Sequence, residues 1–201
     1  DTAKTEHYDV LLTAMVMRLR QLFRDDSLPF LNVQLPMWIA AGDEDKHDWA
    51  RLRLAQARAA SALQPGGLAI LLDCGEFDNI HPTDKRTPGE RLCDVALRVV
   101  YGMDAPESPR ALGKYTQGDT LVVTLSAPVL RRETGELLLE IAGEDGAYHP
   151  VQSVTLDGTE MRLRSVAVLH PAKVRYAYVN WGKVALFGRN GLPLAPFALE
   201  G

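Results

Sequence analysis

Leu68-Ala-Ile-Leu-Leu-Asp-Cys-Gly-Glu-Phe-Asp-Asn-Ile-His-Pro-Thr-Asp-Lys-Arg-Thr-Pro-Gly-Glu-Arg-Leu92 is the stretch of this sequence that decides the fold. Its first five residues, Leu68 to Leu72, form an apolar run of the length expected for a strand that is buried on both faces. A polar loop follows, and a helix is predicted over Gly89 to Val100, with Thr83 or Asp84 as its cap. This order of strand, loop and helix is typical of an open α/β sheet, whose ligands bind at the carboxyl ends of the strands.

Two residues of the polar loop, Asp78 and His81, are suited to acid/base chemistry. An imidazole is an effective base near pH 7 when a carboxylate fixes its tautomer and stabilises the imidazolium. The spacing therefore predicts His81 as a base and Asp78 as its orienting acid, although many loops contain such a pair by chance. A metal site of Asp78, His81 and Asp84 is the less favoured alternative, because transition-metal sites usually recruit a second histidine or cysteines.

The sequence before this stretch predicts one strand between two helices. The first helix covers residues 4 to 24 and carries an apolar stripe that we expect to pack on a sheet. A strand over Phe30 to Leu35 and a helix over Trp49 to Leu63 follow. The order is that of a parallel, doubly wound sheet, but two strands do not make an independent domain. We therefore expect the missing strands to come from sequence outside this chain.

The loop over residues 36 to 48 follows the first predicted strand, at the edge where substrate contacts often lie. Trp38 in this loop is a candidate substrate contact, and simple packing is the equal alternative. On the strand itself, Gln34 either faces the site or bonds to the backbone.

The composition changes after Gly102. Residues 103–118 are rich in proline, glycine and serine and indicate a linker between a first domain at 1–102 and a second at 119–201. From Thr120 onward apolar residues alternate with polar ones, which predicts a small antiparallel β-sandwich with a hairpin at Asp157-Gly158. Aromatic and basic residues at Arg175 to Trp181 either stack on a sugar or pack across strands.

Composition excludes several classes of function. The 201 residues carry a net charge of -4 with no basic cluster, so we expect no nucleic-acid partner. No apolar run approaches the roughly 20 residues that span a bilayer, so we expect no membrane partner. Cys74 and Cys93 are predicted to be free, buried thiols.

A base at His81 needs a nucleophile, and no serine of this chain follows a predicted parallel strand on a tight turn. Cys74 is the local rival, but no positive group is evident to lower the pKa of its thiol. A serine nucleophile would therefore lie on an absent segment or another polypeptide.

Several blocks of the sequence resemble the sialate O-acetylesterase family, a branch of the SGNH hydrolases that includes acetylesterases acting on plant polysaccharides. They are Leu28-Pro-Phe-Leu-Asn-Val-Gln-Leu35, Trp49-Ala-Arg-Leu-Arg-Leu-Ala-Gln56, Asp78-Asn-Ile-His-Pro-Thr-Asp-Lys85 with Gly89-Glu-Arg-Leu92, Val174-Arg-Tyr-Ala-Tyr178 and Gly191-Leu-Pro-Leu-Ala-Pro-Phe197. The resemblance covers nearly the whole chain.

The resemblance implies an α/β fold in which this chain is the C-terminal part of an SGNH-type, flavodoxin-like parallel sheet with flanking helices, followed by the β-sandwich. It implies a serine esterase that removes acetyl groups from sugar hydroxyls of sialic acid or plant polysaccharides, without a cofactor, in the periplasm or outside the cell. His81 and Asp78 would be catalytic, and an N-terminal fragment of the same enzyme would supply the serine and the oxyanion hole. A non-catalytic carbohydrate-binding module and a Cys74 hydrolase are the alternatives.

Overall fold

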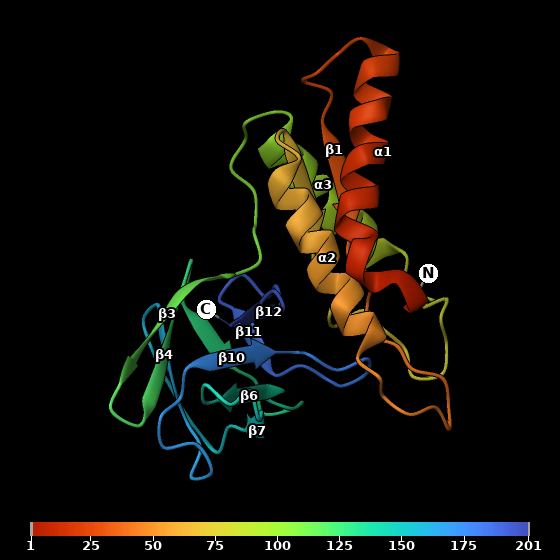
Figure 1. Ribbon diagram of the computed structural model, residues 1–201. Helices are drawn as coiled ribbons and strands as arrows, with labels where there is room; N and C mark the ends of the chain where they lie inside the picture. The colour runs from red at the N-terminus through yellow and green to blue at the C-terminus, as the bar shows by residue number, and fades with distance from the viewer. Residues whose placement is uncertain (1, 201) are drawn as a thin grey trace. The chain divides into compact units, whose positions relative to one another are not determined.

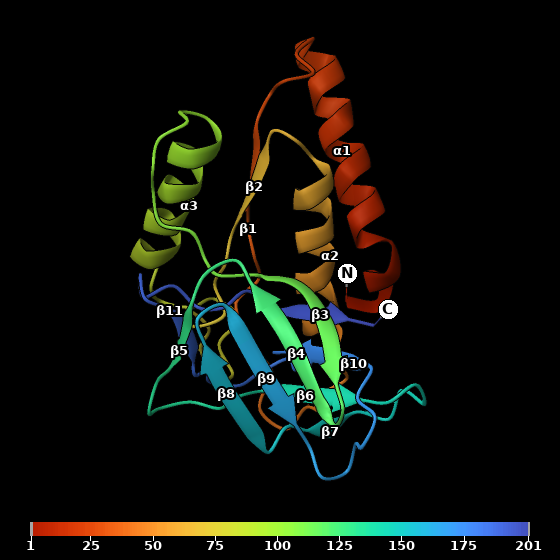
Figure 2. The same cartoon turned by 90° about the vertical axis from the view of Figure 1, so that its left-hand side faces the viewer.

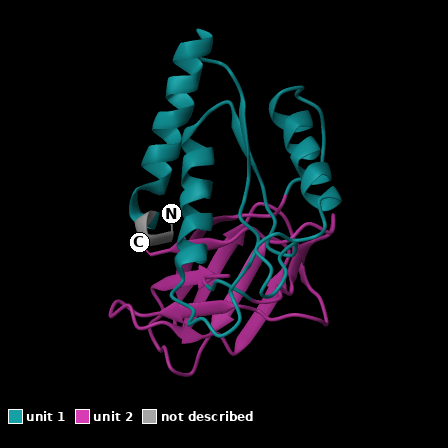
Figure 3. Cartoon of the chain, turned by 90° about the vertical axis from the view of Figure 1, so that its right-hand side faces the viewer, with its two compact units in different colours: residues 1–107, 179–181 teal, residues 108–178, 182–201 magenta. Residues whose placement is uncertain are grey.

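The computed structural model describes residues 2–200 (Figure 1). The chain divides into two compact units, coloured separately in Figure 3. Unit 1 comprises the residues up to Glu107 together with Val179–Trp181. Unit 2 comprises Ser108–Tyr178 and the residues from Gly182 onward. A short segment from late in the chain therefore belongs to the first unit.

Unit 1 has the predicted alternation of helices and strands. Its elements are the 3-10 helix η1 (Thr2–His7), α1 (Tyr8–Phe23), β1 (Phe30–Val33), α2 (Asp48–Ala62), β2 (Gly66–Ala69) and α3 (Arg86–Val99). The two strands pair in parallel, with Phe30 opposite Gly66. Figure 2 shows them between α2 and α3, which both contact the strands. The predicted parallel α/β arrangement is confirmed for these two strands.

The core of unit 1 lies where these layers meet. Its fully or nearly fully buried side chains include Leu52, Ala55 and Ala59 on α2 and Val95 on α3. The predicted apolar run from Leu68 is buried at its end, because Ile70, Leu71 and Leu72 are at most 8% exposed, yet β2 itself ends at Ala69. The chain therefore stays buried for three residues beyond the paired strand and then enters the polar loop.

Helix α1 differs from its prediction. It packs on α2 rather than on the sheet, and Val16 is its one buried apolar residue among those described. Arg20, also buried, donates from Nε to the Leu28 carbonyl and from a terminal nitrogen to the Pro65 carbonyl, both at 3.0 Å. Most of the apolar stripe that the sequence predicts to be covered is exposed.

Unit 2 is built of antiparallel pairs in three sheets. Their strand orders are β3-β4-β9-β8, β12-β10-β6-β7 and β11-β5. The strands are β3 (Ala111–Gln117), β4 (Thr120–Leu125), β5 (Val129–Arg131), β6 (Leu139–Ala142), β7 (His149–Pro150), β8 (Ser153–Asp157), β9 (Glu160–Arg164), β10 (Lys173–Tyr176), β11 (Leu186–Gly188) and β12 (Phe197–Leu199).

Two local features of unit 2 can be compared with the predictions made from the sequence. The hairpin at Asp157-Gly158 is confirmed, because β8 and β9 pair up to Asp157 and Glu160 and Gly158 has a positive φ of 56°. In contrast, β3 occupies seven residues, Ala111–Gln117, of the stretch expected to be a linker. The proline- and glycine-rich composition around it hides a strand that turns into β4 through Gly118, whose φ is 62°.

Among the described residues, no helix combines the length and apolar character needed to cross a membrane. Both cysteines are free, as predicted. Cys74 is half-buried, but Cys93 is exposed, because it lies on the solvent side of α3 rather than on the face toward Val95.

Candidate active site

Two loops of unit 1 meet at the carboxyl ends of β1 and β2, where parallel sheets place their chemistry. Asp78, on the loop after β2, donates its backbone N–H to the Ile39 carbonyl at 3.1 Å. Its Oδ1 accepts the Ala41 N–H at 2.8 Å. Gly75 allows the loops to approach this closely, because a Cβ there would lie 1.9 Å from the Met37 carbonyl oxygen. The loop after β1 therefore fixes the position of Asp78.

Asp78 occupies a turn that begins at Glu76, and its φ of 58° lies in the left-handed region. Asparagine and aspartate tolerate this conformation better than most residues. The Asn79 N–H bonds back to the Glu76 carbonyl at 3.4 Å and closes the turn. The turn points Asp78 toward the loop after β1 while its neighbour Phe77 stays 55% exposed.

The Glu76 carboxylate spans the loop that contains His81. It accepts hydrogen bonds from the Asn79 amide at 2.6 Å, the Thr83 N–H at 2.7 Å and the Thr83 hydroxyl at 2.6 Å. These bonds, those from Thr83 foremost, hold the pKa of Glu76 below its usual 4.5. Glu76 therefore joins both ends of the loop that presents the predicted base, a role that sequence reasoning missed.

His81 is exposed at the centre of this loop. Its backbone N–H bonds to the Asn79 side-chain oxygen at 3.0 Å, and the following Pro82 is buried. Within residues 2–200, no hydrogen bond joins its imidazole to Asp78 or to another side chain. The structure thus places Asp78 and His81 on one loop at the expected edge of the sheet, and their roles as acid and base stay predictions.

The start of α3 fixes the loop on its other side. Asp84 Oδ1 accepts the backbone N–H groups of Arg86 and Thr87, both at 3.0 Å. The predicted capping by Asp84 is confirmed, so this carboxylate is engaged with the helix. In the part of the chain that the structure describes, no group of three or more His, Cys, Asp or Glu side chains is arranged to hold a metal ion.

Cys74 lies beside the loop but has the wrong electrostatics for a nucleophile. Burial, reinforced by the carboxylate of Asp73, raises the pKa of its thiol to about 12. Only the thiolate is strongly nucleophilic, so this environment disfavours Cys74 as a nucleophile near neutral pH. Asp73 is itself held by Arg91 through two bonds of 2.6 and 2.8 Å.

The serines of unit 1 lie at the opposite edge of the sheet. Ser27 precedes β1 and bonds to Asp25, and Ser61 lies in the last turn of α2, shortly before β2. Both are therefore near the amino ends of the parallel strands, whereas His81 follows a carboxyl end. Among the described residues of unit 1, neither serine is placed to be activated by His81.

Of the two predicted substrate contacts, Gln34 is buried and Trp38 is partly exposed. Trp38 packs its ring on Trp49, with centroids 5.2 Å apart, and its indole nitrogen is buried. Gln34 is fully buried and donates to the Arg53 carbonyl at 3.3 Å. Contact of either residue with a substrate stays a prediction.

Sequence reasoning also missed the segment Val179–Trp181, which unit 1 recruits from late in the chain. Arg53 donates to the Val179 carbonyl, and the Trp181 ring lies edge-on to Phe77, with centroids 5.8 Å apart. Burial lowers the pKa of Arg53 to about 9, against the opposing effect of the Asp45 carboxylate, so the guanidinium remains cationic at pH 7.

In unit 2, part of the aromatic and basic cluster expected as a possible sugar platform packs internally. Tyr176 is fully buried against Phe197. The Arg175 guanidinium lies 4.1 Å from the Tyr148 ring centre and 2.7 Å from a Glu140 oxygen. These contacts favour packing as the role of Arg175 and Tyr176, whereas Trp181 of the same cluster belongs to unit 1.

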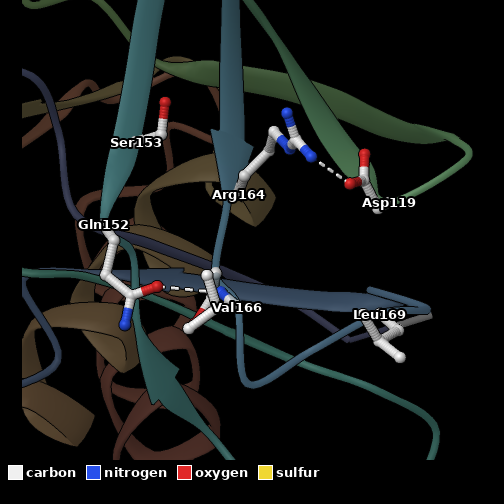
Figure 4. Close-up of a pocket in the computed structure, with 7 residues that line it drawn as sticks. Asp119, Gln152, Ser153, Arg164, Val166 and Leu169 are labelled. Atoms are coloured by element: carbon white, nitrogen blue, oxygen red, sulfur yellow. Dashed lines mark hydrogen bonds and ion pairs between the residues drawn. The ribbon is translucent and has the colours of Figure 1, made fainter.

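Unit 2 also contains a cavity of about 400 Å³ (Figure 4). Arg164 is ion-paired to Asp119 in its wall, and Gln152 accepts the Val166 N–H at 2.8 Å. Its lining residues are Asp119, Gln152, Ser153, Arg164, Ser165, Val166 and Leu169. The lining residues include no histidine or cysteine, and the two charged ones, Arg164 and Asp119, are paired with each other. The cavity therefore lacks a free base of the kind that hydrolysis requires.

Comparison with solved structures shows what this chain is similar to. A neighbour from Xanthomonas citri superposes with a TM-score of 0.87 and is 33% identical over 96% of this chain. That neighbour is a carbohydrate acetylesterase. This chain spans 46% of the neighbour's length. No family model and no curated protein matches the sequence.

Proposed function

We propose that this chain is part of a carbohydrate O-acetylesterase in which His81 is the general base and Asp78 orients it. The observation that carries the proposal is the similarity to an acetylesterase over nearly the whole chain. The Asp78–His81 loop at the carboxyl ends of β1 and β2 supports it, because this is where open α/β sheets place catalytic residues. The nucleophilic serine and the oxyanion hole lie on an N-terminal piece outside these 201 residues.

The exposed apolar residues of α1 support such a piece. Six apolar side chains of α1 are 44 to 68% exposed: Val10, Leu11, Met15, Met17, Leu22 and Phe23. Soluble proteins rarely expose apolar residues in this density without a partner surface. We infer that the N-terminal piece covers α1 and extends the two strands to an SGNH-type, flavodoxin-like parallel sheet.

The mechanism follows from an imidazole that can take and return one proton. His81 accepts the proton of the serine hydroxyl as the serine oxygen attacks the acetyl carbonyl. The sugar oxygen then leaves and takes that proton from the imidazolium, and an acetyl-serine remains. Water, deprotonated by His81, attacks the acetyl-serine, and acetate departs as the proton returns to the serine. Asp78 stabilises the imidazolium in both steps.

The substrate is an acetylated sugar hydroxyl, on sialic acid or a plant polysaccharide, and the enzyme works in the periplasm or outside the cell. A binding module without catalysis is the competing function. It has less support, because Tyr176 in its predicted platform is fully buried.

Acetate release by the native protein that contains this chain tests the proposal. We expect the wild type to hydrolyse acetylated xylo-oligosaccharides and His81→Ala to lose about 10⁴-fold in kcat/KM. His170→Ala, which removes an exposed histidine of unit 2, is the matched control and should stay within about twofold of wild type. Absence of acetate release from the wild type, or an active His81→Ala variant, contradicts the proposal.

A further inference from the structure

The segment Val179–Trp181 is held in unit 1 by several hydrogen bonds, three of which involve Asn180. The Asn180 N–H bonds to Asp45 Oδ2 at 2.8 Å, and the Asn180 carbonyl accepts the Trp38 N–H at 2.8 Å. The Asn180 side-chain oxygen accepts the Trp49 N–H at 2.9 Å, at the first turn of α2. The bonds to Trp49 and Asp45 connect Asn180 to residues that lie 131 and 135 positions away in the sequence.

These bonds fix the side chain that comes next, Trp181. The indole is partly exposed and meets Phe77 edge-on, with ring centroids 5.8 Å apart and planes at 60°. Phe77 is 55% exposed and directly precedes Asp78 in the turn. Ile80, 46% exposed, lies on the same loop one residue before His81. Phe77, Ile80 and Trp181 therefore place exposed apolar surface beside the predicted catalytic pair, Asp78 and His81.

Packing alone does not explain the exposure of Phe77 on a polar loop beside Trp181, which comes from the segment Val179–Trp181. Phe77 has more than half of its surface in water, and a rigidly held tryptophan beside it adds a second flat apolar face. The C–H faces of pyranose rings stack on such surfaces, while the hydroxyl groups at the ring edge remain free for hydrogen bonds. Trp38 is less suited to this role, because its ring packs on Trp49 and its indole nitrogen is buried.

We propose that Phe77 and Trp181 form the subsite that binds a pyranose ring of the acetylated carbohydrate next to His81. This proposal rests on the proposed esterase function. The subsite gives the enzyme selectivity for sugar esters over simple esters. Asn180, Asp45 and Arg53 are positioning residues, because they hold Trp181 and touch no substrate.

The test compares two esters in the native protein that contains this chain. One is an acetylated xylo-oligosaccharide, and the other is methyl acetate, which has no ring to stack. We expect Phe77→Ala and Trp181→Ala to lower the ratio of kcat/KM for the sugar ester to that for methyl acetate by about tenfold or more, through KM. Phe77→Trp, which keeps an aromatic face, should restore the ratio.

Tyr101→Ala is the matched control, because Tyr101 is an aromatic residue of unit 1 that is 69% exposed and lies beyond α3. The ratio of kcat/KM for the two esters should be the same in Tyr101→Ala as in the wild type. If the wild type hydrolyses both esters and Phe77→Ala leaves the ratio unchanged, the subsite is wrong and the esterase function stands. If the wild type hydrolyses neither ester, the esterase function fails and the subsite fails with it.

Discussion

Replacing Asn180 by alanine tests how unit 1 is held together. The substitution removes the oxygen that accepts the Trp49 N–H, while the backbone bonds of residue 180 to Asp45 and Trp38 remain. Asn180 is only 9% exposed, so water does not readily replace the lost acceptor. His47, the residue before α2, makes no capping bond from its side chain, so Asn180 is the acceptor on which the first turn depends.

Leaving a buried N–H without an acceptor costs about 1–3 kcal/mol. With urea m values of about 1–3 kcal/mol/M for small proteins, Asn180→Ala should lower the unfolding midpoint by about 1 M. Tryptophan fluorescence is the appropriate probe, because Trp38, Trp49 and Trp181 all belong to unit 1 and the sequence has three tryptophans.

The control for this measurement is Asn190→Ala in unit 2, which also removes a side-chain oxygen that accepts a backbone N–H, that of Leu192 at 3.2 Å, but at an exposed position where water can replace it. Its fluorescence transition should move by less than about 0.3 M, the scale of an ordinary surface substitution. If the Asn180→Ala midpoint coincides with that of Asn190→Ala, the segment is not an anchor of unit 1 and the reasoning is refuted.

Three further predictions concern the loop after β2. Gly75→Ala places a Cβ 1.9 Å from the Met37 carbonyl oxygen, and we expect a loss of about 2 kcal/mol or more in the same urea experiment, which an unchanged midpoint would contradict. The hydrogen bonds of Glu76 lower its pKa in the folded state, so its bonds to Thr83 are complete above pH 4.5 and are lost as the pH falls through the lower folded pKa. The Thr83 amide resonance should titrate with a midpoint below 4.5, and a midpoint at or above it would show that the bonds do not favour the charged form. Because burial raises the thiol pKa to about 12, Cys74→Ser should keep kcat/KM within about twofold, whereas a thiol-based hydrolase would lose its activity.

The sequence predicts those parts of the fold that depend on neighbours along the chain. The hairpin at Asp157-Gly158 follows from turn chemistry, and the parallel order of β1 and β2 follows from the alternation of strands and helices. The end of the apolar run after Gly67 is buried as expected, because a strand with apolar side chains on both faces is covered on both faces in a packed sheet.

Features that depend on distant partners escaped prediction. Nothing near Asn180 in the sequence indicates that it bonds to Asp45, which lies 135 positions away. The apolar stripe of α1 predicts burial, but the described residues leave Leu11 and Phe23 exposed by 61 and 68%. The spacing of apolar residues identifies the apolar face of a helix, but it does not identify the surface against which that face packs.

The catalytic roles of Asp78 and His81 stay predictions, and the sequence does not indicate the residues that hold their loop in place. Asp78 and His81 are recognisable because carboxylate and imidazole are the residue types that proton transfer needs. The role of Glu76 as a brace depends on loop geometry, since its bonds to Thr83 cross seven positions of irregular chain. A carboxylate followed seven residues later by threonine is too common a pattern to be informative.

The most direct test of the central claim is active-site labelling of the native protein with a serine-directed organophosphate, followed by peptide mass spectrometry. We predict one labelled serine outside the 201 residues and a labelling rate that falls at least about 10³-fold in His81→Ala, because the imidazole must take the serine proton. A label on Cys74 or on a serine within this chain, or labelling of His81→Ala at the wild-type rate, would contradict the account.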